Sequence, residues 1–476
     1  MSDDQKGITK NKQNDMSDWY SQVILKAEIA DYAPVKGCMI IRPYGYAIWQ
    51  NIVNFLDENI KKLGVENAYF PMFIPESFFK KEAEHAKGFA PEVAWIQNKD
   101  DDTKERLALR PTSETIMYDS YARWIRSWRD LPLRINQWCN IIRWEVKDVK
   151  MFLRSREFLW QEGHCVYKTE GDCHEETLMY LEEYRKVLEN LLAVPVILGK
   201  KTEKEKFAGA IRTYTIEGFM PDGKALQLGT SHDLGQGFAK AFNINFVGED
   251  EKEHQPWQNS WGLSTRTIGA MILMHSDDKG LIVPPNVAPI KTVVVPIIFK
   301  KNKEEVLEKA KEIATMLDAK LDDREEYSAG WKFNQWEMKG VPIRIEIGPK
   351  DVEKGHVVLV RRDTGEKEFI KFGDLKETVK QRLLDIQESL FNKANKHLKS
   401  SIIKTEDKKE FYKLLKDKKL VYVDFCGNVD CEEQIKENSG GATSRCVPLD
   451  ANEPQSKKCI NCDKDATVEI YFSKNY

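Results

Sequence analysis

The chain has 476 residues, of which 41% are hydrophobic and 31% charged, and its formal net charge is −3. The length predicts roughly two to four domains of a soluble globular protein. The charge excludes an overall basic field, although local basic surfaces could still bind nucleic acid. No apolar run approaches the ~20 residues that a membrane-spanning helix needs.

The N-terminal stretch 1–16 is polar and is expected to be a disordered tail. It lacks the apolar core of a signal peptide. The nine cysteines are too few for a disulfide scaffold in a chain of this length. The cytoplasm is therefore the expected location.

The first half of the chain contains segments of both helical and extended character. Apolar residues at helical spacing predict a helix over 45–63, and an amphipathic helix is expected over 174–192. Residues 133–145 and 156–167 look extended and are separated by a loop-like stretch, which predicts an antiparallel hairpin.

Beyond residue 290, strands alternate with helices, which suggests a compact α/β domain. A long helix is predicted over 374–398, and a lysine-rich stretch then connects it to a cysteine-rich tail. We expect domains at 17–287, 288–395 and 396–476.

The hairpin segment 143–164, RWEVKDVKMFLRSREFLWQEGH, carries fixed charges of both signs. Arg143 and Glu145 would share one face of a strand, because side chains alternate along it. Arginine offers a planar fork that suits phosphate oxygens, and Arg154 could fold over a polyphosphate. The alternative is a solvent-exposed ladder of ion pairs.

Two other segments place single polar residues in unusual settings. In GLSTRTIGAMI (262–272), Arg266 opens an apolar helix, where a buried charge needs a partner. In ALRPTSETIM (108–117), Thr112 and Glu114 could accept hydrogen bonds from a ligand ammonium. The alternatives are a snorkelling arginine in the first segment and a helix N-cap at Thr112 in the second.

The segment ALQLGTSHDLGQGFAK (225–240) clusters Gln227, Thr230 and His232 around a glycine. The path from strand to turn to helix suggests a binding loop. A glycine-rich turn with a structural histidine is the alternative.

The C-terminal region has two close cysteine pairs, Cys426/Cys431 and Cys459/Cys462. This spacing is typical of a tetrahedral structural zinc site with four thiolates. Buried free cysteines are the alternative. Cys446 is expected to be a spectator, although it could replace one ligand.

These segments together resemble the class II aminoacyl-tRNA synthetases. The helix 45–63 with VENAYFPMF resembles motif 1, the hairpin motif 2, and GLSTRTIGAMI motif 3. The words RPTSET, NQWCNIIRWE, REFLWQEGH, KTEKEKFAGA, GTSH and GWKFNQWEMKGVPIRIEIGPKD are similar to those of prolyl-tRNA synthetases of the archaeal/eukaryotic type. The resemblance covers residue 17 to the final tyrosine.

The resemblance implies an α+β fold, with an antiparallel-sheet catalytic domain, an α/β anticodon-binding domain and a small zinc-binding C-terminal domain. It implies that the chain activates L-proline with ATP and Mg²⁺ and transfers it to tRNA(Pro). It also implies a homodimer that binds neither membrane nor DNA, and a terminal Tyr476 that reaches back to the catalytic domain. Residues 158–261 leave no room for the editing domain of bacterial-type relatives.

The resemblance also assigns residue roles, with Arg143 and Arg266 as the catalytic pair. The expected ATP-binding residues are Arg143, Glu145, Arg154, Ser155, Gln227, Thr230, Ser264 and Arg266, with Gln227 also at magnesium. The expected proline-binding residues are Thr112, Glu114, Arg143, Phe158, Trp160, His164 and His232. For the middle domain, the candidates for contacts with anticodon bases are Arg344, Glu346, Lys350, Arg361 and Arg362, and a solvated charged sheet face is the alternative.

Two alternative functions would explain part of these sequence features. Another class II synthetase, such as the threonyl or glycyl enzyme, would share Arg143 and Arg266 but not RPTSET with GTSH and REFLWQEGH. A synthetase-like protein that only binds tRNA would be expected to lack the motif arginines, which this chain keeps.

Overall fold

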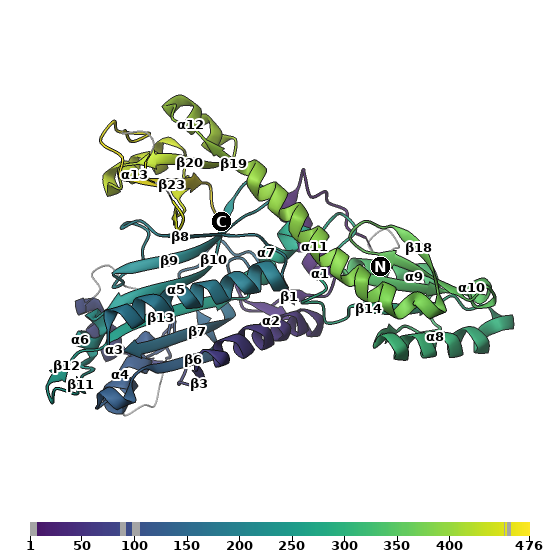
Figure 1. Cartoon of the computed structure of the whole chain (residues 1–476), viewed down its shortest axis with the longest axis horizontal. Coiled ribbons are helices and arrows are strands. Elements are labelled where there is room, and N and C mark those ends of the chain that lie inside the picture. The colour runs from purple at the N-terminus through teal and green to yellow at the C-terminus, as the bar shows by residue number, and fades with distance from the viewer. Residues whose placement is uncertain (1–6, 86–91, 98–104, 452, 455–457) are drawn as a thin grey trace.

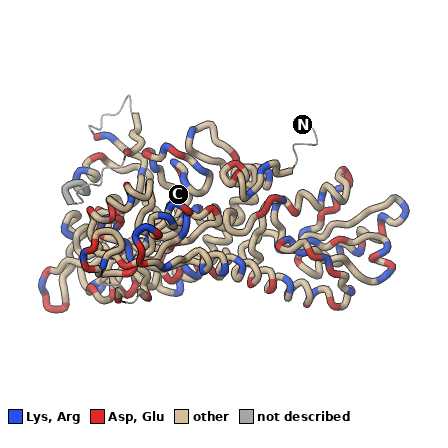
Figure 2. The backbone as a smooth tube through the Cα atoms, turned by 90° about the horizontal axis from the view of Figure 1, so that it is seen from above, with Lys and Arg blue, Asp and Glu red and all other residues tan. Residues whose placement is uncertain are grey.

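The computed structural model describes residues 7–85, 92–97, 105–451, 453–454 and 458–476. Two lobes and a smaller C-terminal domain are connected along one long helix, and the last residues of the chain return to the first lobe (Figure 1). Basic and acidic positions are interspersed along the whole backbone (Figure 2). No helix in the described part of the chain is long and apolar enough to cross a bilayer.

The first lobe is built on an eight-stranded sheet whose strands β8, β9, β10, β13, β7 and β6 pair antiparallel in that order. Its strands, from one edge to the other, are β22 (Val447–Pro448), β8 (Ile197–Lys200), β9 (Arg212–Phe219), β10 (Ala225–Gly235), β13 (Trp257–Ser264), β7 (Glu157–Tyr167), β6 (Leu133–Ile142) and β3 (Glu66–Asn67). The edge strand β22 comes from the C-terminal region, so the two ends of the sequence share one sheet.

Helix α5 lies across one face of this sheet (Figure 1). Tyr180 of α5 stacks on Trp261 of β13 with ring centroids 4.0 Å apart. The helices whose buried residues share this core are α1 (Met16–Lys26), α2 (Pro43–Lys62), α5 (Glu170–Lys186) with its π-helical extension Val187–Leu191, and α7 (Arg266–His275). Burial of this many apolar side chains is the main stabilisation of the lobe.

The opposite face has a smaller core at one end of the sheet. Helices α4 (Glu114–Trp124) and α6 (Gly237–Phe242) contribute to it, and α3 (Glu76–His85) lies beside them. The rest of that face carries polar and aromatic side chains and lines a cavity. Three short strand pairs complete the lobe: β1 (Ala30–Tyr32) with β2 (Met39–Ile41), β4 (Phe73–Pro75) with β5 (Leu107–Leu109), and β11 (Phe246–Val247) with β12 (Glu253–His254).

The second lobe has a five-stranded mixed sheet, as expected for an α/β domain. Its strand order is β15 (Lys320–Leu321), β14 (Thr292–Pro296), β16 (Ile343–Ile347), β17 (His356–Arg361) and β18 (Lys367–Lys371), with helices α8 (Lys303–Leu317), α9 (Ala329–Met338) and α10 (Pro349–Lys354). Helix α11 (Leu375–Ser401) presents apolar residues to this core and then leads into the third domain.

The C-terminal domain is a small sheet with two helices. Its strands are β19 (Ile402–Lys404), β20 (Leu420–Phe425), β23 (Val468–Ser473) and β21 (Thr443–Ser444), and its helices are α12 (Lys408–Lys416) and α13 (Val429–Asn438). The lysine-rich stretch after α11 is therefore not a bare connector, because it forms β19 and α12.

Several predicted boundaries need correction. The expected strand over 133–145 ends at Ile142, so Arg143 and Glu145 lie in the loop between β6 and β7 rather than on a strand face. A turn closed by Val146 N–H to Arg143 O follows at once, and this turn ends the ladder. The predicted helices 45–63, 174–192 and 374–398 are found as Pro43–Lys62, Glu170–Lys186 with its π-helical extension, and Leu375–Ser401.

The expectation of a disordered tail over 1–16 is wrong for residues 7–16. Lys12 donates its backbone N–H to Asp278 and its ammonium to the carbonyl of Ser276, and Thr9 N–H bonds Gln22. These contacts hold the segment against the end of α7. Residues 1–6 lie outside the described part.

Gly163 of β7 sits where any side chain would collide with the core. A Cβ placed there would come 2.0 Å from the Trp261 ring, which is held by its stack on Tyr180. We expect Gly163→Ala to lower the free energy of unfolding by about 1–3 kcal/mol or more, because overpacked cores must shift rigid groups. Gly330→Ala in α9 is the matched control, since nothing lies within 4 Å of its Cβ. Urea unfolding of the two variants tests this, and equal stability would contradict it.

Candidate active site and cysteine cluster

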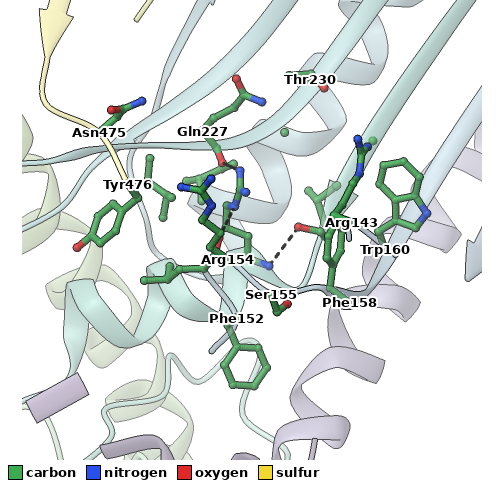
Figure 3. Close-up of a pocket in the computed structure, with 18 of the residues that line it drawn as sticks. Arg143, Phe152, Arg154, Ser155, Phe158, Trp160, Gln227, Thr230, Asn475 and Tyr476 are labelled. Atoms are coloured by element: carbon green, nitrogen blue, oxygen red, sulfur yellow. Dashed lines mark hydrogen bonds between the residues drawn. The ribbon is translucent and has the colours of Figure 1, made fainter. Parts of the chain in front are cut away.

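A cavity of about 600 Å³ opens on the face of the sheet opposite α5. Alternation along the strands places every second residue there: Phe158 and Trp160 of β7 face the cavity, whereas Gln161, the next residue, accepts a hydrogen bond from Tyr184 of α5 on the other face. All the residues expected to bind ATP line it, namely Arg143, Glu145, Arg154, Ser155, Gln227, Thr230, Ser264 and Arg266. They come from β10, β13, α7 and the β6–β7 loop (Figure 3).

Arg266 is a partly buried cation that lines this cavity. Its Nε donates to the carbonyl of Leu153 at 3.0 Å, and its Nη1 donates to the carbonyl of Gln227 at 3.1 Å. Burial lowers the pKa of Arg266 to about 10; Glu217 opposes this effect, and the charges of Arg143 and Arg154 add to it. The guanidinium therefore stays charged at neutral pH, next to other cations, in a position where an anion would be stabilised.

A second cavity of about 310 Å³ adjoins the first, and Arg143, Trp160, Gln227 and Thr230 line both. Figure 3 shows Arg143 beside Trp160 at this junction. A ligand that fills both cavities would pass the Arg143 guanidinium. The expected proline-side residues Thr112, Glu114, Arg143, Trp160, His164 and His232 line the second cavity.

Phe158 is an exception. It was expected on the proline side, but it lines the larger cavity only, with its ring 6.2 Å from that of Trp160. Phe158 points to the same face of the sheet as Trp160, but it lies two residues earlier on the strand, so the two Cα atoms are roughly 6.6 Å apart. Its position suits an aromatic base rather than a small ring.

The second cavity has a buried acid–base cluster on its wall. Glu162 accepts hydrogen bonds from Ser113 and Gln137 and contacts His164 Nε2 at 3.1 Å. Burial alone would raise the pKa of Glu162, but the hydrogen bonds from His164, Ser113 and Gln137 outweigh it, and the pKa is lowered. Burial would lower the pKa of His164, but its bond to Glu162 and the charge of Glu114 outweigh it, and the pKa is raised. The pair is therefore ionic.

The other histidine of this cavity is neutral. Burial, helped by the charge of His164, lowers the pKa of His232 to about 3. His232 Nδ1 lies 3.0 Å from the Thr213 hydroxyl, and its ring lies 4.8 Å from that of Phe207. His232, Phe207 and Trp160 thus provide uncharged, flat walls, while Glu114 provides a carboxylate.

Thr112 is not the N-cap of α4. The cap position is Ser113, which makes no side-chain cap bond, because its hydroxyl donates to Glu162 instead. The Thr112 hydroxyl donates to the Glu114 carboxylate, and both are buried. The polar side chains at the start of α4 therefore hydrogen-bond to residues of the cavity wall and do not cap the helix backbone.

Several lining residues were missed in the sequence. Glu162 could have been found, because it lies between Trp160 and His164 at the strand period of two. Lys201, Glu205, Phe207, Arg445 and Asn475 also line one or both cavities. Arg445 and Asn475 come from the C-terminal region, and nothing in their sequence surroundings marks them as cavity residues. Tyr476 also lines the larger cavity, and its backbone N–H bonds Ala225 O.

In the second lobe, the candidate base-contacting residues are largely paired within the protein. Arg344 bonds Glu346, and Arg361 bonds Asp363. Arg362 is nearly buried and makes two bonds to Asp277 of the first lobe. Arg362 therefore connects the lobes, and the proposal of a base contact is weakest for this residue.

Cys426, Cys431, Cys459 and Cys462 come together in the C-terminal domain, and all four sulfur atoms lie within 4.8 Å of one another. The Cys431–Cys459 and Cys426–Cys462 sulfurs are 3.8 and 3.6 Å apart, too far for disulfides. Four thiolates at ~2.3 Å from a tetrahedral zinc ion would have about this separation. Asn461 Nδ2 donates to Cys431 Sγ at 3.4 Å, as a supporting neighbour of a ligand would. Cys446 lies outside this group, buried against Gly199 of β8.

Three family models match the chain. A class II tRNA synthetase core domain (G, H, P, S and T) matches residues 95–275, an anticodon binding domain matches 291–382, and the prolyl-tRNA synthetase C-terminal domain matches 408–476. None of these three models is an editing domain.

Curated relatives match along nearly the whole chain. The proline–tRNA ligase of Natranaerobius thermophilus is 51% identical over 470 residues, 97% of this chain and 96% of the relative. That of Alkaliphilus oremlandii is 49% identical over 97% and 96%, and proline–tRNA ligase 2 of Clostridioides difficile is 48% identical over 98% of each. These relatives are bacterial.

The Glu162–His164 pair predicts a particular pH dependence of stability. The folded-state pKa of His164 is raised above its ordinary 6.5, so its ionic contribution is complete below that value and is lost as pH rises through the raised pKa. Glu162 has a lowered pKa and stays ionised above its ordinary 4.5. We expect His164→Gln to destabilise the protein most near pH 5–6 and least near pH 9. Urea unfolding across this range is the measurement, with His254→Gln as control, because the ion pair of His254 with Asp250 is exposed and contributes little; a constant difference for His164→Gln would contradict the buried ionic pair.

Proposed function

The chain belongs to the prolyl-tRNA synthetase family, and from this premise we propose that it activates L-proline with ATP and transfers the prolyl group to tRNA(Pro). The observation that carries the proposal is that Arg143 lines two adjoining cavities, one large and cationic, the other small with aromatic walls and a carboxylate. The first suits a nucleoside triphosphate. The second suits a small apolar ring with an ammonium group.

The residues fit the roles that such a reaction requires. Attack of the proline carboxylate on the α-phosphorus brings two anions together, and the fixed cations Arg143 and Arg266 stabilise the charge that spreads over the phosphoryl oxygens. Arg154 would hold the outer phosphates, Glu145 the adenine amine, and Phe158 would stack on the base. No nucleophilic side chain is required, because the substrate carboxylate is the nucleophile.

In the second cavity, Glu114 and Thr112 would accept hydrogen bonds from the secondary ammonium of proline. Trp160, His232 and Phe207 would bound the ring, and the neutral state of His232 fits an apolar neighbour. The His164–Glu162 ion pair would hold the wall that carries Glu114 in place. We assign proline binding to Thr112, Glu114, Arg143, Trp160, His164 and His232.

Mg²⁺ would accompany ATP, with the Gln227 side chain and the Thr230 hydroxyl as its oxygen donors beside the phosphates. The ion would supply further positive charge to the phosphate oxygens. The four cysteines would hold Zn²⁺ in a purely structural site, because all four tetrahedral positions are taken by thiolates.

The domain division that we propose is 17–287 for catalysis, 288–395 for anticodon binding and 396–476 for the zinc domain. Within the family we assign the chain to the archaeal/eukaryotic type of architecture. The match to the prolyl C-terminal domain supports this assignment, as does the sheet region itself, since residues 158–261 are used by β7 to β13 and their helices. The relatives are bacterial, so the type describes domain composition rather than source.

We also propose a homodimer in the cytoplasm, with tRNA(Pro) as the macromolecular substrate. Exposed Tyr32, Val35 and Ile40 lie on β1, β2 and the turn between them, and exposed Tyr46 lies at the start of α2, in the helix that resembles motif 1. An apolar patch of this kind is typical of an interaction surface.

ATP–pyrophosphate exchange tests the activity directly. We expect exchange with L-proline and none with threonine or glycine, and we expect Arg143→Ala to reduce it at least about a hundredfold, as loss of a group that stabilises developing charge does. Arg123→Ala, an exposed arginine of α4, is the matched control. Full exchange by Arg143→Ala would refute its phosphate role, and exchange with another amino acid would refute the substrate.

The metal site predicts about one zinc ion per chain by elemental analysis. We expect Cys459→Ala to release the zinc ion and to lower the melting temperature. The domain is small, so zinc coordination by the thiolates would supply part of its folding free energy. Cys446→Ala, a buried cysteine outside the cluster, should keep the metal. A full zinc content in Cys459→Ala would rule out the four-thiolate site.

A further inference from the structure

Besides Asn475 and Tyr476, the C-terminal domain contributes one buried charged side chain to the large cavity, that of Arg445. Its backbone belongs to that domain, because its N–H bonds Tyr471 O of β23 at 2.7 Å. Its side chain instead enters the first lobe and lines the large cavity. The next residues form β22, which pairs with β8 at the edge of the catalytic sheet.

The partner of Arg445 is Glu217 of β9. Arg445 donates Nε at 3.1 Å and Nη2 at 2.7 Å to the same carboxylate oxygen, Oε2. The other oxygen, Oε1, accepts from Lys201 Nζ at 2.8 Å and from the Thr215 hydroxyl at 2.9 Å. The side chains of all three charged residues are 5% exposed or less.

This cluster holds one negative and two positive charges beside the cavity that Arg143, Arg154 and Arg266 also line. Burial alone would raise the pKa of Glu217, but Arg445 and Lys201 outweigh it and lower the pKa, so the carboxylate is ionised. Arg445 and Lys201, the partners of this carboxylate, line the cavity, so its charge would repel a polyphosphate bound there unless it were neutralised. Two cations on one carboxylate leave a net positive charge toward the cavity.

We propose that Arg445 is a positioning residue for ATP, which acts through Glu217: together with Lys201 it more than neutralises this carboxylate, so that the cluster and Arg266 present net positive charge to the polyphosphate. The proposal rests on the proposed function, since it deepens the nucleotide site. The C-terminal domain thereby contributes to nucleotide binding as well as to stability. Gly199 of β8 allows β22 to pair so closely with the catalytic sheet. A Cβ at this position would come 2.5 Å from Val447 O and would push β22 away.

The test measures binding of MgATP to the full chain by titration calorimetry without proline or tRNA. We expect Arg445→Met to weaken binding roughly ten- to hundredfold, because Glu217 loses two charge-assisted hydrogen bonds and its charge then faces the phosphates. Arg445→Lys keeps the charge but not both bonds, and should weaken binding less. In exchange assays the KM for ATP should rise while the KM for proline stays unchanged.

The double variant Glu217→Gln/Arg445→Met separates this role from others. A neutral glutamine neither repels phosphate nor needs Arg445, so we expect most of the ATP affinity to return. Glu433→Gln is the matched control, because it removes another ion pair between the C-terminal domain and the first lobe, with Lys204, away from the cavity. It should bind MgATP as the wild type does.

Three results would overturn the proposal: wild-type affinity in Arg445→Met, no recovery in the double variant, or equal losses in Arg445→Met and Glu433→Gln. Thermal unfolding confirms that each variant is folded, and Arg445→Lys serves if Arg445→Met is not. A wild-type chain that binds MgATP without exchanging proline would remove the proposed function and leave this inference standing. One that does not bind MgATP would overturn both.

Discussion

Positive charge concentrated on one face of the catalytic sheet is the constraint on which the site depends. Arg143, Arg154, Arg266, Lys201 and Arg445 line one cavity, and desolvation lowers the pKa of Arg266. Such a concentration costs free energy in the empty protein, because like charges repel and lose water. Binding of an anion with several charges would recover this cost, in line with the polyphosphate of the proposed substrate.

The sheet can tolerate this unfavourable concentration of charge because one of its faces packs against a hydrophobic core while the other lines the cavity. On the α5 side, Trp261, Tyr180 and their neighbours form a core in which even one methyl group at Gly163 would not fit. On the other side, alternate residues of the same strands form the cavity walls. The strand period of two therefore connects stability and chemistry, since each strand contributes to both with adjacent residues.

The contacts that tie the small C-terminal domain into this arrangement include the β22–β8 pairing, the Arg445–Glu217 ion pair, and the return of Asn475 and Tyr476 beside Ala225. Each contact joins segments more than two hundred residues apart in the sequence. If the cysteine cluster stabilises this domain, it would also affect the shape of the large cavity. The Arg445–Glu217 ion pair would connect the two, because Arg445 belongs to the domain and lines the cavity.

The sequence by itself determined the secondary structure of the strongly periodic segments and the grouping of four cysteines, because periodicity and spacing are local properties, whereas the family resemblance named the candidate residues on β7, β10 and α7. It did not determine that Arg143 and Glu145 lie in a loop, that Phe158 lines only the larger cavity, or that residues 7–16 pack against the first lobe. Only the tertiary structure decided those points, and only it brought Arg445 to Glu217. The reason is that a long-range contact depends on how the strands are ordered in the sheet, and no local pattern around Arg445 records that order.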